Sequence, residues 1–416
     1  MLEALEKFAD RIKPHLYLWI AVMVAIPRLV FLAIQPERSL SGNAPAMLAI
    51  ADNMLAGNGF RDDSGVPDGH FSPIYIAVLA GNRAVTHDSL VLVKLAHIGF
   101  DVLTAVLLTS LLTSLLPTAT ILLFAVVFAL HPLVLYYANN INEECLLTLA
   151  VTISFLALYR AFEKPSLNRM ILAGAAGGLA TMVKGSALFL PFGIAVAGAL
   201  LLATPARGKW LLWAVYLGSY LVVLMPWGYR NYEVFGRFSI NPRGFGQNLW
   251  WGSDPRIFTN YGTSREEAVR QSIVEMTAKG VRCPGTNDLF ATEGWELNMG
   301  LENYKELVPH PIALLHILWM KGSRTFYASE NRPSAHAMLV AIQLPLILLA
   351  FVGWFRLFQS AQTKQFAVLM LLFIGYFFAV VSAGLPMVRY FLPALPLLMI
   401  AAVCGLSARC VRLHAG

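Results

Sequence analysis

The sequence predicts an all-α polytopic membrane protein, with a bundle of about ten transmembrane helices. The chain has 416 residues, of which 57% are hydrophobic and only 13% are charged, and its mean hydropathy is +0.62. Apolar segments of membrane-crossing length recur along it, and only two long polar stretches interrupt them, roughly 35–85 and 229–335. A soluble protein of this length rarely carries so little charge, so lipid is the solvent for most of the chain.

The composition argues against several other classes. The net charge of +7 comes from lysines and arginines at the ends of apolar segments, with no long basic run, so nucleic-acid binding is not indicated. The four cysteines (Cys145, Cys283, Cys404 and Cys410) have no metal-ligand spacing, and a disulfide framework is not expected. The histidines form no zinc-binding pair, so we predict no tight metal site, although the carboxylates are compatible with a divalent cation.

The chain begins with a short stretch in which Leu2, Leu5, Phe8 and Ile12 recur at helical spacing between charged residues. This pattern predicts a helix on the cytoplasmic surface of the membrane. The apolar run that follows is too long for a cleavable signal and is expected to remain as an anchor. The predicted spans are residues 15–34, 90–114, 118–138, 144–162, 169–183, 186–204, 210–228, 336–355, 366–385 and 390–408.

Two apolar segments need separate interpretation. The span 169–183 is short, and its Gly174, Gly177 and Gly178 favour close contact with a neighbouring helix. A nucleotide-binding loop is not indicated there, because no predicted strand precedes these glycines. The apolar run 309–320 is interpreted as an interfacial helix, since a span at this point would invert the orientation of everything after it.

The basic residues orient the bundle. Those beside the short loops fall on one side if there are about ten spans, so the positive-inside rule predicts both termini in the cytoplasm. The two long polar stretches then lie outside. We divide the chain into a transmembrane module 1–228 with its loop 35–85, an outer region 229–335, and the C-terminal helices 336–416. The orienting residues are Lys7, Arg11, Lys13, Arg160, Lys164, Arg169, Arg207, Lys209, Arg356, Lys364, Arg409 and Arg412.

The outer stretches are expected to contain amphipathic helices. Pro45 starts a helical run that ends at Gly57 and Gly59, and a second short helix follows Pro73. Charged residues at helical spacing predict further helix within 252–308. Such helices commonly lie flat on a membrane surface, and here they would also roof a cavity.

Four motifs lie on the predicted outer side. The motifs are ADNMLAGNGF (51–60) with PIY (73–75), NEE (142–144), PWGYRNYEVFGRF (226–238) with GQNLWWG (246–252), and RYFLPALP (389–396). Together they resemble motifs of the bacterial GT-C glycosyltransferases, of the protein-mannosyltransferase and aminoarabinose-transferase type.

The resemblance implies a GT-C-type helix bundle with periplasmic amphipathic helices in a bacterial inner membrane. It also implies a transferase that takes a sugar from a polyprenyl-phosphate donor at the periplasmic face. The acceptor would be a glycolipid, a polysaccharide or a protein, and a single displacement would invert the anomeric carbon.

A lipid-phosphate leaving group needs cations, and the fork of an arginine holds two phosphate oxygens. Our candidates for binding the donor phosphate are Arg389 with Tyr390, Arg230 and Lys184. The alternative for each cation is an interfacial anchor whose charge reaches the lipid headgroups.

An acceptor hydroxyl or amine needs a base, and the resemblance implies an Asp early in the first outer loop. This sequence has Asn43 there, which cannot take a proton. Either the chain is an engineered Asp-to-Asn variant, or a nearby carboxylate (Asp62, Asp63 or Asp68) serves instead, or the protein binds without catalysing.

Three further carboxylates lie in or beside spans. Glu143 and Glu144 open a span, where a helix dipole favours them, or they orient the acceptor or bind a divalent ion. Asp101 lies inside a span, where an unpaired charge costs on the order of 3 kcal/mol. It is expected to face the interior, with Lys94 or a residue from another helix as its partner.

Several aromatic and amide side chains are candidates for contacts with the sugar or the acceptor. They are Trp227, Tyr229, Asn248, Trp250 and Tyr75, and anchoring at the membrane interface is the competing role for the aromatic ones. Two other functions compete with the transferase. One is a flippase for a lipid-linked sugar, against which we find no pair of repeated halves. The other is a non-catalytic relative that binds lipid phosphate, which Asn43 favours.

Overall fold

The computed structural model describes residues 13–35, 40, 42–87, 89–201, 206–259, 264–284, 288–329 and 333–407, with the backbone alone at 199–201 and 206–209. The predicted amphipathic helix at residues 2–12 lies outside these ranges, as do Cys410 and the orienting residues Lys7, Arg11, Arg409 and Arg412. Most of the described residues are helical and none of them lies in a β-strand, which confirms the all-α prediction.

Each predicted span corresponds to one helix or to a short series of helices, since long apolar stretches can satisfy their backbone groups in lipid only as helices. They are α2 (Leu16–Ile34), α5 (Val91–Leu115), α6 (Thr118–Leu130) with α7 (Pro132–Ala138), α8 (Glu144–Glu163), α9 (Leu167–Val183), η2 (Gly185–Ala187) with α10 (Leu190–Leu201), α11 (Ala206–Phe235), α17 (His336–Gln359), α18 (Lys364–Ala383), and α19 (Val388–Phe391) with η4 (Leu392–Ala394) and α20 (Leu395–Leu406).

Within the described residues, seven helices are long and apolar enough to cross a membrane, or up to eight if α6 and α7 form one span. These two helices are bent by 56° around His131. The helices α9 and α10 are apolar but have only 17 and 12 residues. Two of the ten predicted spans are therefore shorter than the roughly 20 residues that a membrane-crossing helix needs.

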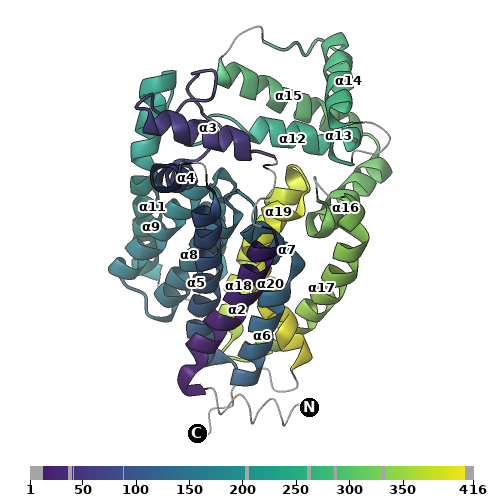
Figure 1. Cartoon of the computed structure of the whole chain (residues 1–416). Coiled ribbons are helices and arrows are strands. Elements are labelled where there is room, and N and C mark those ends of the chain that lie inside the picture. Colours follow the sequence, from purple (N-terminus) through teal and green to yellow (C-terminus); the bar gives the residue numbers. More distant parts are fainter. Residues whose placement is uncertain are drawn as a thin grey trace.

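The remaining helices gather at one end of the bundle (Figure 1). α2 begins and α20 ends at the opposite end, where Ser407 accepts a hydrogen bond from Thr120 at the start of α6. We call the gathered helices the outer layer. It consists of α3 (Ala44–Leu55), α4 (Pro73–Thr86), α12 (Phe245–Ser253), α13 (Pro255–Thr259), α14 (Arg265–Ala278) and α15 (Leu289–Leu307).

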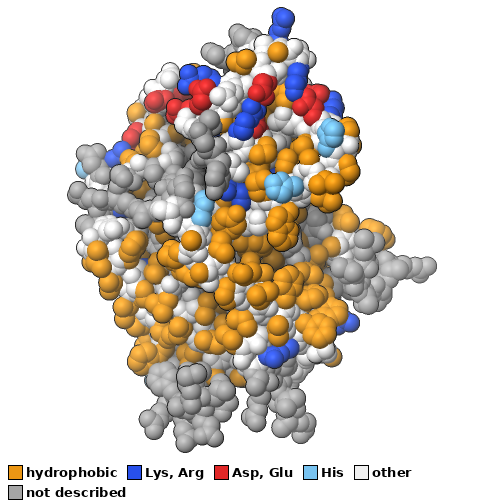
Figure 2. Space-filling model, turned by 90° about the vertical axis from the view of Figure 1, so that its right-hand side faces the viewer, with side chains coloured by type: hydrophobic (Ala, Val, Ile, Leu, Met, Phe, Trp, Pro, Cys, Tyr) orange, Lys and Arg blue, Asp and Glu red, His pale blue; other side chains and the backbone are white. Residues whose placement is uncertain are grey.

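The surface changes character between the bundle and the outer layer. In Figure 2 hydrophobic side chains cover the bundle on the visible face, and charged side chains gather at the end of the outer layer. The helix α16 (Pro311–Tyr327) joins the two regions, and it exposes Ile312 and Trp319. Its 17 residues do not place it among the candidate spans, and its interfacial position remains a prediction.

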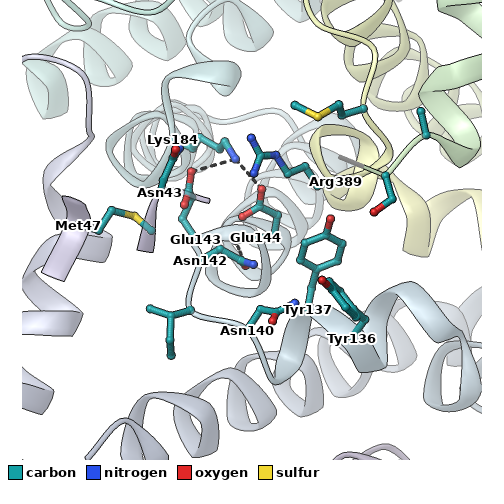
Figure 3. A pocket seen from close by; sticks show the side chains of 14 residues that line it. Asn43, Met47, Tyr136, Tyr137, Asn140, Asn142, Glu143, Glu144, Lys184 and Arg389 are labelled. Carbon is teal, nitrogen blue, oxygen red and sulfur yellow. Dashed lines mark hydrogen bonds and ion pairs between the residues drawn. The ribbon is translucent and has the colours of Figure 1, made fainter. Parts of the chain in front are cut away.

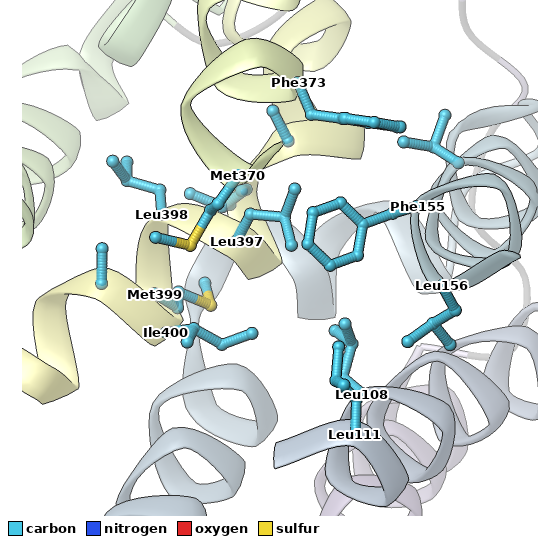
Figure 4. Close-up of a cluster of buried hydrophobic side chains, with 14 of the residues drawn as sticks. Leu108, Leu111, Phe155, Leu156, Met370, Phe373, Leu397, Leu398, Met399 and Ile400 are labelled. Atoms are coloured by element: carbon cyan, nitrogen blue, oxygen red, sulfur yellow. The ribbon is translucent and has the colours of Figure 1, made fainter. Parts of the chain in front are cut away.

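The core runs through the middle of the bundle. The segment Val388–Leu406 is the most buried of the candidate spans, with 83% of an 18-residue stretch inside the protein. Figure 4 shows Leu397 and Met399 of α20 among Leu108 of α5, Phe155 of α8 and Phe373 of α18. The segment that begins with Arg389 and its neighbours therefore continues into the most buried helix of the bundle.

Small residues allow two helix pairs to come close together. A Cβ atom at Gly174 of α9 would lie 2.0 Å from the carbonyl oxygen of Tyr216 in α11, which confirms the close contact predicted from the glycines. A Cβ atom at Gly353 of α17 would lie 1.8 Å from the carbonyl oxygen of Ala401 in α20. Both approaches require the absence of a side chain.

We therefore predict that Gly353→Ala destabilises the protein by about 1–3 kcal/mol, because the added methyl group must push α17 away from α20. The measurement is the thermal unfolding midpoint of the purified protein in detergent. The control is Gly375→Ala in α18, where an added Cβ atom meets nothing within 4 Å. Equal midpoints for the two variants would contradict the predicted contact.

Candidate active site

A pocket that we call the charged pocket lies where the bundle meets the outer layer (Figure 3). Its walls come from the start of α3, from α7 and the turn before α8, from the end of α9, from the turn after α16, and from α19. Segments distant in the sequence thus converge on it. The pocket contains Glu143, Glu144, Lys184 and Arg389, all of which the sequence analysis singled out.

Lys184 is held by two carboxylates. Its Nζ atom lies 2.9 Å from Oε1 of Glu143 and 2.7 Å from Oε1 of Glu144. The helix α9 ends at Val183, and the extended backbone of Lys184 directs the side chain toward the start of α8. Glu143 is the N-cap residue of α8 and Glu144 is its first residue, where a helix dipole favours negative charge.

Burial and pairing oppose each other at this cluster. Burial raises the pKa of Glu143, but the ammonium group of Lys184, a backbone hydrogen bond and Arg389 together lower it below its usual value. For Lys184 the effects have the opposite signs. Burial lowers its pKa, but the carboxylates of Glu143 and Glu144 raise it by more, so the pKa of Lys184 is above its usual value. The Lys184–Glu143 pair is therefore ionised at neutral pH. The Oε2 atom of Glu144 is buried and has no hydrogen-bond partner among the described residues.

Arg389 lies on the other side of the same pocket. Its Nη2 atom donates a hydrogen bond to the hydroxyl oxygen of Tyr390 at 2.8 Å, and its Cζ atom lies 4.7 Å from the centre of that ring. The Nζ atom of Lys184 lies 4.8 Å from the same ring centre. The ring of Tyr390 thus contacts both cations, and the two basic side chains share one site.

The chain before Arg389 is fixed by the outer layer and by α16. A Cβ atom at Gly252 of α12 would lie 1.9 Å from the carbonyl oxygen of Gly384, so backbone packs on backbone there. Lys321 of α16 donates to the carbonyl oxygen of Ala383 at 2.9 Å, and Val388 donates to that of Ala328 at 2.9 Å. These contacts determine where α19 begins.

A second cavity, which we call the apolar cavity, adjoins the charged pocket. It has a volume of about 1660 Å³ including space open to solvent, and its walls come mainly from α4, η2, α12 and α18. Most of its lining is apolar, with Phe189 and Val380 as examples, whereas His70 and Arg243 are polar. The residues that line both spaces are Asn43, Met47, Glu143 and Lys184.

Asn43, Tyr75 and Asn248, predicted from the sequence, also line these spaces. The hydroxyl group of buried Tyr75 lies 3.0 Å from Nε2 of His97, and burial raises its pKa well above the usual value. The amide of Asn248 donates to the carbonyl oxygen of Gly244. The side chain of Asn43 makes no capping hydrogen bond at the start of α3.

Three predicted carboxylates line neither space. Oδ1 of Asp62 accepts hydrogen bonds from the backbone of Ser64 and Val66, at 3.0 and 2.8 Å. Oδ1 of Asp68 accepts from the backbone of His70 and Phe71, both at 3.0 Å. Asp63 is exposed. These side chains shape and cover the loop between α3 and α4, so we do not retain them as candidate bases.

Arg230 and three predicted aromatic residues also lie elsewhere. The guanidinium of Arg230 donates to the carbonyl oxygens of Phe60 and Asp68, both at 2.9 Å, and packs on Trp227. Tyr229 is exposed. Trp250 is buried, and its Nε1 atom donates to the hydroxyl oxygen of Ser272 at 2.9 Å. The residues of this set fasten the outer layer or cover its surface.

The structure adds pocket residues that the predicted set lacks. Tyr136 and Tyr137 of α7 and Asn140 after it form one wall of the charged pocket. The sequence signal for them is His131-Pro132, which breaks a span just before a run of polar and aromatic residues. Among the described residues, no group of three or more His, Cys, Asp or Glu side chains could hold a metal ion.

Residues 70–229 match the model of the family described as dolichyl-phosphate-mannose-protein mannosyltransferase. This part of the chain includes Glu143, Glu144 and Lys184. The match confirms the resemblance to GT-C membrane glycosyltransferases over these residues. No curated protein matches the chain.

Two solved structures are similar to the chain, both of ArnT from Cupriavidus metallidurans. One is bound to undecaprenyl phosphate, with 16% sequence identity, a TM-score of 0.44, and coverage of 93% of this chain and 77% of that one. The other is in the apo state, with the same identity and TM-score, and covers 93% of this chain and 76% of that one.

We predict that Lys184→Met destabilises the protein by about 3–5 kcal/mol near neutral pH, because two buried carboxylates lose their cation. In the wild type the lowered pKa of Glu143 contributes stability above its usual pKa, and this contribution is lost as the pH falls. In the variant burial, the largest influence on this group, raises its pKa and is opposed only by a backbone hydrogen bond and by Arg389, so we expect the variant to lose stability as the pH rises. The difference in unfolding midpoint should therefore be large at about pH 7.5 and small at about pH 5.

Lys184→Arg keeps the cation and serves as the control for this prediction. Its unfolding midpoint should follow that of the wild type at both pH values. A difference between Lys184→Met and the wild type that is the same at both values would show that the charge of the pair is not its cause.

Proposed function

We propose that this protein is a membrane glycosyltransferase that takes a sugar from a polyprenyl-phosphate donor and transfers it to an acceptor at the periplasmic face of a bacterial inner membrane. The observation that carries the proposal is the junction of two spaces at Glu143 and Lys184: a pocket with buried charges and a large, mostly apolar cavity. A phosphate attached to a sugar and to a long hydrocarbon chain needs both environments within a few ångströms.

The orientation in this proposal rests on charge. The short loops at the end opposite the outer layer carry Arg160, Lys164, Arg169, Arg356 and Lys364, which the positive-inside rule places in the cytoplasm. Both termini would then be cytoplasmic, and the charged pocket would open toward the periplasm. The description of the matching family supports the donor class, because dolichyl phosphate is a polyprenyl phosphate.

Arg389 and Lys184 would bind the donor phosphate. When the bond between the anomeric carbon and the phosphate oxygen breaks, the electron pair moves to that oxygen, and negative charge grows on the phosphate. Two cations at the site stabilise this charge, and electrostatic stabilisation of this kind is usually the largest single contribution to catalysis. The ring of Tyr390 lies against both cations and keeps them from spreading apart.

Glu143 would act as the base. It lines both spaces, whereas Glu144 lines the charged pocket alone and Asn43 cannot accept a proton. As the acceptor oxygen or nitrogen bonds to the anomeric carbon, its proton would move to the carboxylate of Glu143. A donor phosphate that draws Lys184 toward itself weakens the hold of the ammonium on Glu143, and this raises the basicity of the carboxylate. A single displacement of this kind inverts the anomeric carbon.

The experiment is incubation of the purified protein in liposomes with a polyprenyl-phosphate sugar labelled in the sugar. Transfer of the label to an acceptor supports the proposal. Movement of the donor between leaflets without transfer would replace the transferase by a flippase. Binding with neither movement nor transfer would indicate the non-catalytic relative that Asn43 favours.

For this assay we predict that Glu143→Gln lowers kcat by about 100- to 10,000-fold, because the amide cannot take the acceptor proton. The matched variant is Glu144→Gln, which removes the other carboxylate that binds Lys184. It should lower kcat less than Glu143→Gln does. A larger effect at residue 144 than at residue 143 would assign the base to Glu144 instead.

We also predict that Arg389→Gln lowers kcat/KM for the donor by about 100- to 1,000-fold, because one cation at the leaving phosphate is lost. The same substitution at Arg270 is the control, since that side chain is 74% exposed on α14. Arg270→Gln should leave the kinetics unchanged. An Arg389→Gln variant with the wild-type kcat/KM would remove Arg389 from the donor site.

A further inference from the structure

A buried ion pair lies in the bundle below the charged pocket. The Nε atom of Arg28 in α2 is 2.7 Å from Oδ2 of Asp101 in α5, and the two side chains are 0% and 2% exposed. This contact confirms that the partner of Asp101 comes from another helix. Neither residue lines the charged pocket or the apolar cavity.

The guanidinium group of Arg28 also reaches the end of α6. Its Nη2 atom donates to the carbonyl oxygen of Phe128 and its Nη1 atom to that of Ala129, both at 3.4 Å. These carbonyl oxygens lie at the break between α6 and α7. Pro132 has no N–H group, so the carbonyl oxygen of Phe128 cannot receive its usual helical hydrogen bond.

A carbonyl oxygen inside the hydrocarbon region must be satisfied by the protein, because lipid offers no donor. Arg28 supplies donors at the point where the helix bends by 56°. The bend aims α7 at the charged pocket, and α7 carries Tyr136 and Tyr137 into its wall. The position of this wall therefore depends on a residue from another helix.

The carboxylate of Asp101 connects to a second wall. It lies beside the buried thiol group of Cys145 in α8, the helix that packs against α5. Cys145 directly follows Glu143 and Glu144 in the sequence, so Asp101 packs against the start of the helix that presents both carboxylates. Lys184 and Arg389, by contrast, come from the end of α9 and from α19.

We propose that Arg28 and Asp101 are positioning residues for glycosyl transfer. The pair fixes the position of the α6–α7 bend relative to the start of α8. It thereby places Glu143, the proposed base, and the wall formed by Tyr136 and Tyr137 against the bound donor. This inference rests on the proposed function. Since the pair acts on the walls that carry the base and the tyrosines, and not on the elements that carry the two cations, its loss affects turnover more than donor binding.

The first experiment compares Asp101→Asn with the wild type in the transfer assay. The amide keeps the shape of the side chain but removes its charge. We expect kcat to fall by about tenfold or more while KM for the donor stays within about threefold, a separation that general destabilisation would not produce. The control is Thr109→Val, which replaces another buried polar group two turns along α5 and should leave both constants unchanged.

The second experiment reads the wall directly and does not depend on turnover. Asn140→Cys is introduced into a background in which Cys283 and Cys410 are replaced by serine, and the labelling rate with a thiol reagent is measured. Asn140 is 8% exposed, so displacement of α7 by Asp101→Asn should raise the rate by about fivefold or more. Thr109→Val should not change it.

The outcomes separate the two proposals. A wild-type protein that transfers no sugar would overturn the proposed function, and the labelling rate would still show whether the pair holds the wall. A wild-type kcat in Asp101→Asn overturns the positioning role even if labelling changes, as does a lower kcat with unchanged labelling.

If Asp101→Asn fails to fold, Arg28→Lys replaces it, because lysine keeps the charge but cannot span the carboxylate and both carbonyl oxygens.

Discussion

A charge or a peptide group inside a bilayer must find its partner within the protein, because hydrocarbon offers neither a counterion nor a hydrogen bond. This constraint shapes the molecule at two levels. Within the bundle it brings Arg28, Asp101 and the broken end of α6 together. At the boundary of the bundle it brings Lys184 between Glu143 and Glu144. The charged pocket exists because polar groups at the ends of several spans satisfy one another there.

The arrangement of charges has a chemical meaning. The charged pocket contains two basic side chains and two carboxylates, so it is close to neutral before any substrate enters. In the proposed function, an anionic headgroup competes with the carboxylates for the two cations. Electrostatic attraction is thus kept for a ligand that brings its own negative charge, and an empty pocket does not leave an uncompensated charge buried.

The sequence predicted the helices well, because hydropathy over a long window reports directly on solvent. It was less informative where a span contains Pro132, since the break and its 56° bend depend on contacts with other helices. The predicted end of the span 210–228 was also too early, because α11 continues beyond the apolar segment to Phe235.

The candidate site was predicted in part for a related reason. Glu143, Glu144, Lys184 and Arg389 each lie at the end of a span on one face, and span ends must converge when helices pack. Other candidates did not follow this rule. Asp62 and Asp68 bind the backbone of their own turns. Arg230 lies in α11 and donates to the carbonyl oxygen of Asp68 in that loop. Sequence position indicates on which side of a membrane a side chain lies. It does not indicate whether nearby backbone groups already use the hydrogen-bonding capacity of that side chain.

The contact between Gly252 and Gly384 joins the outer layer to the chain before Arg389 without any intervening side chain. Because two peptide groups pack directly on each other there, a movement of α12 would be transmitted to the chain near Gly384. A compound or an antibody fragment that draws α12 outward would unseat the chain that precedes Arg389. If the proposed function holds, inhibition would then not require an apolar molecule that competes with the lipid donor, because a ligand of the outer layer could displace Arg389 from outside the pocket.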